Sequence, residues 1–210
     1  MTRYLAIHPD DPQPRLLAQA AEALRCGGVV ALPTDCCYAL ACRLGDKEAV
    51  ERIRHIRQLD DRHHLTLMCR DLSEIAQFAR VDNAQYRLLK AATPGSYVFI
   101  LEGTRELPRR VLHPRRKTIG LRVPDHVVAR ALLAELGEPL LTTTLILPGD
   151  EGPLTEAWEI QERLDEQIEL IIDGGYCGTT PTTMIDLTDM PPVLVRVGRG
   201  PLEPFGLERE

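Results

Sequence analysis

Hydroxyl side chains interrupt several apolar stretches of this sequence. Thr34 follows "VVAL", Thr142 to Thr144 stand in a row in "LLTTTLIL", and Thr182 precedes "MIDL". Because side chains alternate across a strand, three consecutive threonines place hydroxyls on both faces of a sheet. A buried hydroxyl needs a hydrogen-bond partner, so at least one of these threonines requires a protein group or a ligand. For any single threonine, a hydrogen bond to the local backbone is an equally good explanation.

Arginines stand in or beside predicted strands. Arg122 lies in "IGLRVP", and Arg196 lies in "VRVGRG". A guanidinium in an apolar strand needs an acceptor, and its planar fork suits a carboxylate or a phosphate. Asp35 has a simpler explanation, as an Asx-turn residue between two strands. We therefore expect Arg122 to contact an anion, either a substrate carboxylate or a phosphate.

The cysteines do not indicate a metal or a disulfide framework. An even number of six permits disulfides, but the length and the expected compartment argue against them. No C-x-x-C occurs, which argues against zinc, and no metal site is expected. Most of the cysteines are interpreted as buried small apolar residues. Cys36 or Cys37 could act as a nucleophile, although no neighbouring residue identifies a base.

The composition is that of an ordinary globular protein. The chain has 210 residues, of which 44% are hydrophobic and 27% are charged. This length suffices to bury a core, and we expect a single domain over residues 1–210. No apolar run reaches about 18 residues, so no membrane span is expected. The N-terminal residues lack the apolar core of a signal peptide, which predicts a cytoplasmic location.

Charge is segregated along the chain, although the net charge is -6. Residues 52–64 and 108–122 are basic, whereas residues 150–170 are acidic. Such segregation can create one face that attracts anions, although each stretch alone is also explained as a solvated surface. The net charge does not suggest a nucleic-acid binder, but the second stretch holds the cations Arg109, Arg110, Arg115, Arg116 and Lys117 without an acid.

Hydrophobic periodicity predicts a chain of mixed strands and helices. Asp46, Asp71 or Ser73, and Asp82 are expected to cap helices, and an acidic helix is expected over residues 156–168. Short links at 33–38 and 188–192 predict antiparallel strand pairs, because a parallel crossover needs about a dozen residues or more. The sequence therefore predicts a single α/β domain with a mixed sheet and flanking helices. Neither a Rossmann nor a P-loop phosphate motif is present.

Several motifs, in order, resemble those of the YrdC-like family. "GGVVALPTDCCYALAC" is similar to its "G-G-x-x-x-x-P-T-D-T-x-Y-G-L" opening, and "TPGSYVFIL", "IGLRVPDH", "IIDGGYCGTTPTTMIDL" and "VRVGRG" resemble its later segments. The resemblance covers nearly the whole chain. "IHPDDPQPRLLAQA", "IRQLDD" and "TLMCRDLSE" resemble the YciO-type branch of the family.

This resemblance implies a twisted, open, mixed sheet with a basic concave surface. It also implies a threonylcarbamoyl-AMP synthase, which joins ATP, L-threonine and bicarbonate, releases pyrophosphate and serves the modification of adenosine 37 in tRNA. ATP as a substrate implies Mg²⁺ with it. The implied substrate-binding residues are Thr34, His64, Arg122, Thr142 and Thr182, and the implied ATP-binding residues are Arg57, Thr118, Thr144 and Arg196. No residue is assigned a catalytic role.

Two positions depart from the family motifs. The family's "K-x-R-P" falls on residues 57–60, where Leu59 replaces the arginine. The family's "S-x-N" falls on residues 144–146, where Ile146 replaces the asparagine. A lost hydrogen bond to a charged group costs about 1.5–3 kcal/mol, which is roughly ten- to a hundredfold in affinity. We therefore expect weaker ATP binding than in relatives that keep both motifs.

Three functions fit the sequence. The first is a threonylcarbamoyl-AMP synthase with weakened activity. The second is a non-catalytic module that binds nucleotide, tRNA or double-stranded RNA through phosphate contacts and shape. Members of the family have been described as binding double-stranded RNA, and the resemblance implies as RNA-binding cations Arg109, Arg110, Arg115, Arg116 and Lys117. The third is an enzyme that adenylates a different small acid. Pyrophosphate release from ATP, with and without L-threonine and bicarbonate, distinguishes them.

Overall fold

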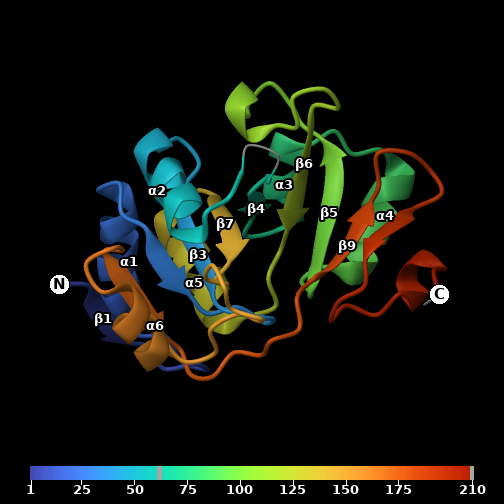
Figure 1. Cartoon of the computed structure of the whole chain (residues 1–210). Coiled ribbons are helices and arrows are strands. Elements are labelled where there is room, and N and C mark those ends of the chain that lie inside the picture. Colours follow the sequence, from blue (N-terminus) through green and yellow to red (C-terminus); the bar gives the residue numbers. More distant parts are fainter. Residues whose placement is uncertain (61–62, 209–210) are drawn as a thin grey trace.

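The chain folds into one α/β domain (Figure 1), and the computed structural model describes residues 1–60 and 63–208. The helices are α1 (Pro14–Arg25), α2 (Lys47–Arg57), α3 (Leu72–Phe78), α4 (Asn83–Ala92), α5 (Val127–Leu136) and α6 (Ala157–Leu164), with short 3₁₀ turns η1 (Arg109–Val111) and η2 (Glu203–Phe205). The strands are β1 (Arg3–Ala6), β2 (Val30–Leu32), β3 (Ala39–Arg43), β4 (Thr66–Met68), β5 (Tyr97–Glu102), β6 (Thr118–Arg122), β7 (Leu140–Thr144), β8 (Leu170–Asp173), β9 (Thr183–Asp186) and β10 (Val193–Arg196).

The strands form a single open sheet in the order β1-β8-β2-β3-β7-β4-β6-β5-β9-β10. The pairs β1/β8, β2/β8, β4/β6 and β5/β9 are parallel, and the remaining neighbours are antiparallel. The two short links do join antiparallel pairs, β2/β3 and β9/β10. The predicted mixed sheet with flanking helices is therefore confirmed.

Most helix ends follow the sequence signals. The carboxylates of Asp46, Asp71 and Asp82 accept hydrogen bonds from the first turns of α2, α3 and α4, as predicted. The acidic helix is shorter than predicted, because α6 ends at Leu164 rather than at residue 168. Asp165 Oδ1 accepts hydrogen bonds from the backbone N–H groups of Thr2 and Glu166, which offer this carboxylate partners outside the helix.

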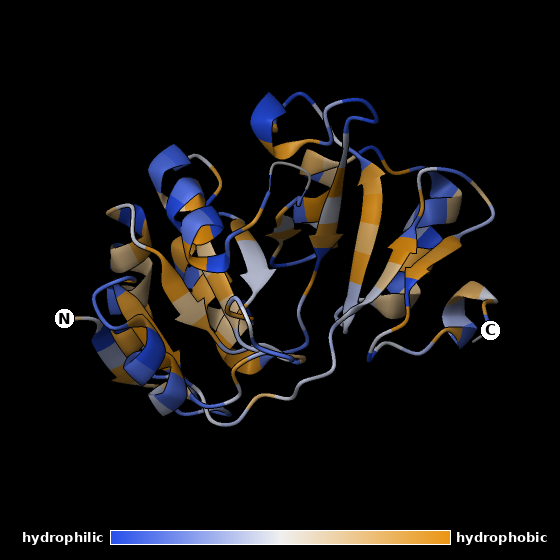
Figure 2. Ribbon diagram, viewed as in Figure 1, coloured by the Kyte–Doolittle hydropathy of each residue, from blue (hydrophilic) through white to orange (hydrophobic). Residues whose placement is uncertain are grey.

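Helices cover the sheet through two apolar clusters. α1 and α5 pack on each other and on buried residues such as Leu32, Met68 and Leu140. α2, α3, α4 and α6 contribute to a larger cluster that includes Leu67 and Leu121. Figure 2 shows the apolar strands between helices whose outer faces are hydrophilic. Within the described chain, none of the helices combines the length and apolarity needed to cross a membrane.

Candidate functional site

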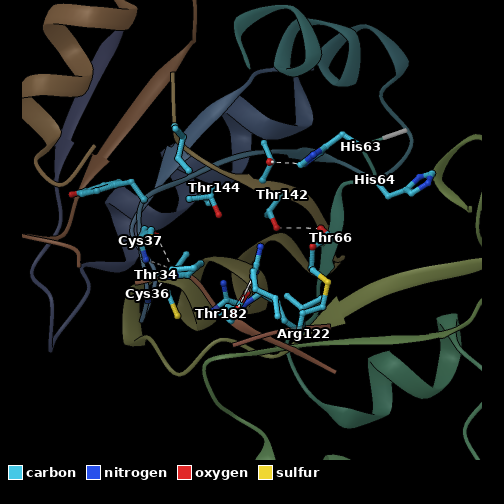
Figure 3. Close-up of a pocket in the computed structure, with 18 of the residues that line it drawn as sticks. Thr34, Cys36, Cys37, His63, His64, Thr66, Arg122, Thr142, Thr144 and Thr182 are labelled. Carbon is cyan, nitrogen blue, oxygen red and sulfur yellow. Dashed lines mark hydrogen bonds between the residues drawn. The ribbon is translucent and has the colours of Figure 1, made fainter. Parts of the chain in front are cut away.

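Three strands end together and open a cavity of about 310 Å³, called here the strand-end cavity (Figure 3). Ala39 at the start of β3 pairs with Thr144 at the end of β7, and Thr66 at the start of β4 pairs with Thr142. The lining residues are Thr34, Cys36, Cys37, Tyr38, Ala39, Arg57, His63, His64, Thr66, Val98, Arg122, Thr142, Thr143, Thr144, Ile146, Pro181, Thr182, Met184 and Arg196. The short β4 thus brings residues that are far apart in the sequence to one site.

Two of the predicted threonine hydroxyls of the strand-end cavity, those of Thr34 and Thr142, already have protein partners. Thr34 Oγ1 donates to the carbonyl of Cys37 at 2.7 Å and accepts from the backbone N–H groups of Cys36 and Cys37. Thr142 Oγ1 donates to the carbonyl of Thr66 at 3.1 Å. Thr34 therefore holds the turn between β2 and β3, which is the simpler explanation for this hydroxyl.

Arg122 forms a buried ion pair at the cavity wall. Its Nη2 lies 2.5 Å from Asp35 Oδ1, and both side chains are only 8% exposed. Ser96 Oγ donates to the other oxygen of Asp35 at 2.6 Å. Arg122 Nε is buried and has no hydrogen-bond partner in the described part of the chain. Asp35 is thus more than a turn residue. The anion that Arg122 contacts is this protein carboxylate, and its contact with a substrate carboxylate or a phosphate stays a prediction.

Two further guanidinium groups border the same cavity. Arg57 Nη1 donates to Thr143 Oγ1 at 2.8 Å and to the carbonyl of Thr144, while its Nε is buried without a partner among the described residues. Burial lowers the pKa of Arg57. Arg196 donates through Nε and Nη2 to the carbonyl of Thr182 and through Nη2 to its hydroxyl. Each arginine is thus oriented by a backbone carbonyl or a carboxylate.

Two adjacent histidines also line the strand-end cavity. His64 was predicted, whereas His63 was not. His63 Nε2 lies 3.4 Å from Thr143 Oγ1, and burial, followed by the charge of Arg57, lowers the pKa of this imidazole. Burial also lowers the pKa of His64. Both rings therefore favour the neutral form. Two consecutive histidines just before an apolar strand were the available signal for His63.

The thiols at the cavity wall are poor nucleophiles. All six cysteines are free, and Cys26 is exposed. Burial raises the pKa of Cys37 to about 11 and also raises the pKa of Cys36. Since the thiolate is the reactive form, these two residues stay protonated near neutral pH. The structure thus favours the interpretation of these cysteines as small apolar residues.

Thr118 is the predicted ligand-binding residue that does not line the strand-end cavity. It begins β6, is buried, and pairs with Glu102 of β5. The sheet register explains this position, because Thr118 and Arg122 lie on the same face of β6 but at opposite ends of the strand. Its predicted role in ATP binding gains no geometric support.

The two basic stretches meet at a hollow beside the strand-end cavity. Arg54 of α2 lines the same hollow as Arg109 and Arg110. Figure 1 places α6 beside β8 and away from η1. Arg116 Nη2 instead pairs with Asp186 at 3.2 Å, and Lys117 Nζ donates to the carbonyl of Pro114. Residues 61 and 62 of the first stretch lie outside the described residues.

A family model described as "Telomere recombination", Sua5_yciO_yrdC, matches residues 22–198. The "Uncharacterized protein YciO" of Escherichia coli K12 is 56% identical over 205 residues, which cover 98% of this chain and 100% of that one. The crystal structure of E. coli YciO superimposes with a TM-score of 0.94 over 98% of this chain and 100% of that one.

Longer proteins with assigned names are also similar. A threonylcarbamoyl-AMP synthase of Bacillus subtilis is 31% identical, over 90% of this chain and 54% of that protein. The crystal structure of Pyrococcus abyssi Sua5 complexed with L-threonine has a TM-score of 0.88 and 28% identity, over 96% of this chain and 59% of that one. This chain thus spans little more than half of each.

Proposed function

The chain belongs to the Sua5/YciO/YrdC family, and from this premise we propose that its strand-end cavity binds ATP and L-threonine and forms threonylcarbamoyl-AMP. Bicarbonate would supply the carbamoyl carbon, pyrophosphate would leave, and the product would serve modification of adenosine 37 in tRNA. The L-threonine complex of the related Sua5 supports the choice of amino acid. Such a reaction would take place in the cytoplasm.

One observation carries this proposal: three guanidinium groups converge on one cavity, and two of them keep a buried N–H without a partner among the described residues. These atoms are Arg57 Nε and Arg122 Nε. A buried donor without an acceptor is costly, at about 1–3 kcal/mol. An oxyanion in the cavity would offer an acceptor to the N–H groups of the three guanidiniums that face it. ATP phosphates and the threonine carboxylate are anions of that kind.

The chemistry needs no covalent nucleophile from the protein. The threonine amine would attack the carbon of bicarbonate, and loss of water would leave an N-carboxylate. This carboxylate would attack the α-phosphorus of ATP, forming a mixed anhydride and expelling pyrophosphate. Arg57 and Arg196 would stabilise the charge that develops on the phosphates. Arg122 and Thr182 would orient the amino acid.

Magnesium enters this proposal only as the counter-ion of ATP. Protein-bound Mg²⁺ usually has one or two carboxylate ligands in addition to substrate phosphates. The described residues that line the strand-end cavity include neither Asp nor Glu, and Asp35 is engaged by Arg122 and Ser96. In the described chain, no cluster of three or more His, Cys, Asp or Glu residues could hold a metal. The described residues therefore do not fit a resident magnesium ion.

The two motif departures have different surroundings. Ile146 lines the strand-end cavity, whereas Leu59 packs against the larger apolar cluster and is not a lining residue. An isoleucine where the family has an asparagine removes a polar contact directly at the cavity. We therefore expect ATP binding to be weaker than in relatives with the intact motif.

The test is pyrophosphate release from ATP, measured with and without L-threonine and bicarbonate. We expect release only when all three substrates are present, and at least a tenfold loss of activity in Arg196→Ala, because a charge-assisted contact is removed. Arg130→Ala, on exposed α5 surface, is the matched control and should keep activity. Pyrophosphate release that does not depend on L-threonine would indicate that another acid is the substrate. The absence of both pyrophosphate release and ATP binding would refute the proposal.

RNA binding is the second candidate function, because both basic stretches border one hollow. Binding would be weak, indifferent to RNA sequence and steeply dependent on salt, since released counterions would drive it. Charge reversal at Arg109, Arg110, Arg115 and Arg116 should abolish it. Gel-shift titrations with duplex RNA and tRNA at two salt concentrations provide the measurement. No binding at low salt, or binding that does not change with salt, would eliminate this candidate.

A further inference from the structure

A second cavity, of about 320 Å³, lies across His64 from the strand-end cavity. His64 lines both cavities, and Figure 3 shows its ring turned away from Thr142. The His113 ring lies 5.1 Å from the His64 ring, centroid to centroid. The lining residues, from α2, β7, the approach to β4 and the segment around η1, are Val50, Glu51, Arg54, His64, Leu65, Arg109, Arg110, Val111, Leu112, Pro114 and Leu141. We call it the arginine-rim cavity.

The arginine-rim cavity has an apolar floor and a basic rim. Its aliphatic side chains are buried, with exposed fractions of 0% to 8% for Val50, Leu65, Val111, Leu112 and Leu141. Among the described lining residues, Arg54, Arg109 and Arg110 supply three positive charges and Glu51 supplies the one carboxylate. A ligand that fits must therefore carry an anionic group and an apolar or aromatic body.

Two of the three rim arginines are held in place by the backbone. Arg54 donates to the carbonyls of Asp60 and His63, and Arg110 donates to the carbonyl of Gly45. The Arg109 guanidinium has no hydrogen bond or ion pair with the described residues. A guanidinium carries five N–H donors, so these contacts leave donors for a ligand. Side chains that are already ordered lose less entropy when they bind.

We propose that the arginine-rim cavity is a second ligand site, which binds a small organic phosphate with an aromatic body, namely a nucleoside monophosphate. One guanidinium group can bind two phosphate oxygens at once, and it can also stack on an aromatic ring. The cavity volume lies at the lower end of the range of about 300–1,000 Å³ for ligand sites. The site is separate from the proposed reaction centre and does not require that the protein be a synthase.

Calorimetric titration of the full chain with AMP at low salt tests this proposal. Wild type should bind two AMP molecules, one in each cavity. The double variant Arg109→Ala/Arg110→Ala should lose one site or bind there about tenfold or more weakly. Arg196→Ala should weaken only the strand-end site, and Arg130→Ala should change neither. Arg109 and Arg110 are exposed, so thermal melting should show an unchanged fold in the double variant.

The outcomes separate this proposal from the proposed function. A single AMP site that responds to Arg109→Ala/Arg110→Ala but not to Arg196→Ala would support the second ligand site and contradict nucleotide binding in the strand-end cavity. A single site with the opposite response would overturn the second ligand site. Adenosine bound as tightly as AMP would also overturn it, because phosphate would not be recognised. If AMP does not bind and duplex RNA binds through the same two arginines, the surface serves RNA instead.

Discussion

The two cavities are nearly equal in volume and share the wall formed by His64, yet their arginines are in different environments. In the strand-end cavity, the Arg122 side chain is only 8% exposed and is paired with a carboxylate side chain of equal exposure. In the arginine-rim cavity, Arg109 and Arg110 are exposed above an apolar floor. Electrostatic interactions weaken as solvent screens them. A buried arginine therefore helps to hold the structure at the first cavity, whereas the exposed arginines of the second cavity remain available to contact a ligand.

The largest expected effect comes from breaking the buried pair. Asp35→Ala leaves the Arg122 charge buried without its partner, and this should reduce the free energy of unfolding by about 3–5 kcal/mol. The matched exposed pair is Arg80 with Glu102, whose side chains are 67% and 50% exposed. Arg80→Ala should cost about 0–1 kcal/mol. Chemical denaturation of both variants makes the measurement, and equal losses would show that burial does not distinguish these ion pairs.

Restoring a family residue at the strand-end cavity should increase its affinity for ATP. Ile146→Asn introduces a polar group at the lining, and one added hydrogen bond contributes about 0.5–1.5 kcal/mol. ATP affinity should thus increase roughly two- to tenfold. Calorimetry should compare this variant with wild type and with a relative that keeps both motifs. Wild-type affinity equal to that of the relative would contradict the expected defect, as would an Ile146→Asn variant without any gain.

A smaller effect is expected from Glu51, the one carboxylate among the described residues that line the arginine-rim cavity. Glu51→Gln removes a charge that competes for the rim arginines, and exposed charge interactions contribute about 0.2–1 kcal/mol. In an Arg196→Ala background, AMP affinity should rise by up to about fivefold. Glu48→Gln, on the same helix but outside this lining, is the control. An equal change of AMP affinity in Glu51→Gln and Glu48→Gln would mean that AMP binding depends only on the overall charge of α2.

The smallest effect concerns His126, which caps α5 through a hydrogen bond from Ala129 N–H. Burial lowers its pKa, with Arg122 acting in the same direction and Asp35 and Asp125 opposing it. The unfolded chain therefore binds a proton at higher pH, so this residue costs stability as the pH falls through about 6.5 toward the lowered value.

Asn is also a good N-cap, so His126→Asn removes the titration while keeping the cap. The loss of melting temperature between pH 7.5 and pH 5 should be smaller in the variant, by about a degree or two. An unchanged or larger loss would assign the acid sensitivity to other groups, such as His63 and His64, whose pKa values are also lowered.

Local signals in the sequence predicted local structure well. The caps at Asp46, Asp71 and Asp82 depend on hydrogen bonds within three residues, and such bonds follow from residue type and spacing. The acidic helix was predicted too long because Asp165 is also bonded to Thr2, a partner that is 163 residues away in the chain. Long-range partners of this kind leave no local pattern.

The sequence by itself determined the mixed sheet, the family and the need of Arg122 for an anion. Hydrophobic periodicity, ordered motifs and a charged residue in an apolar strand are all properties of residue order along the chain. Tertiary structure alone decided which anion Arg122 contacts, that His63 joins the site, and that Thr118 does not. It also decided that two basic stretches, about fifty residues apart along the chain, border one cavity. The strand order sets those distances, and strand order depends on packing across the whole sheet.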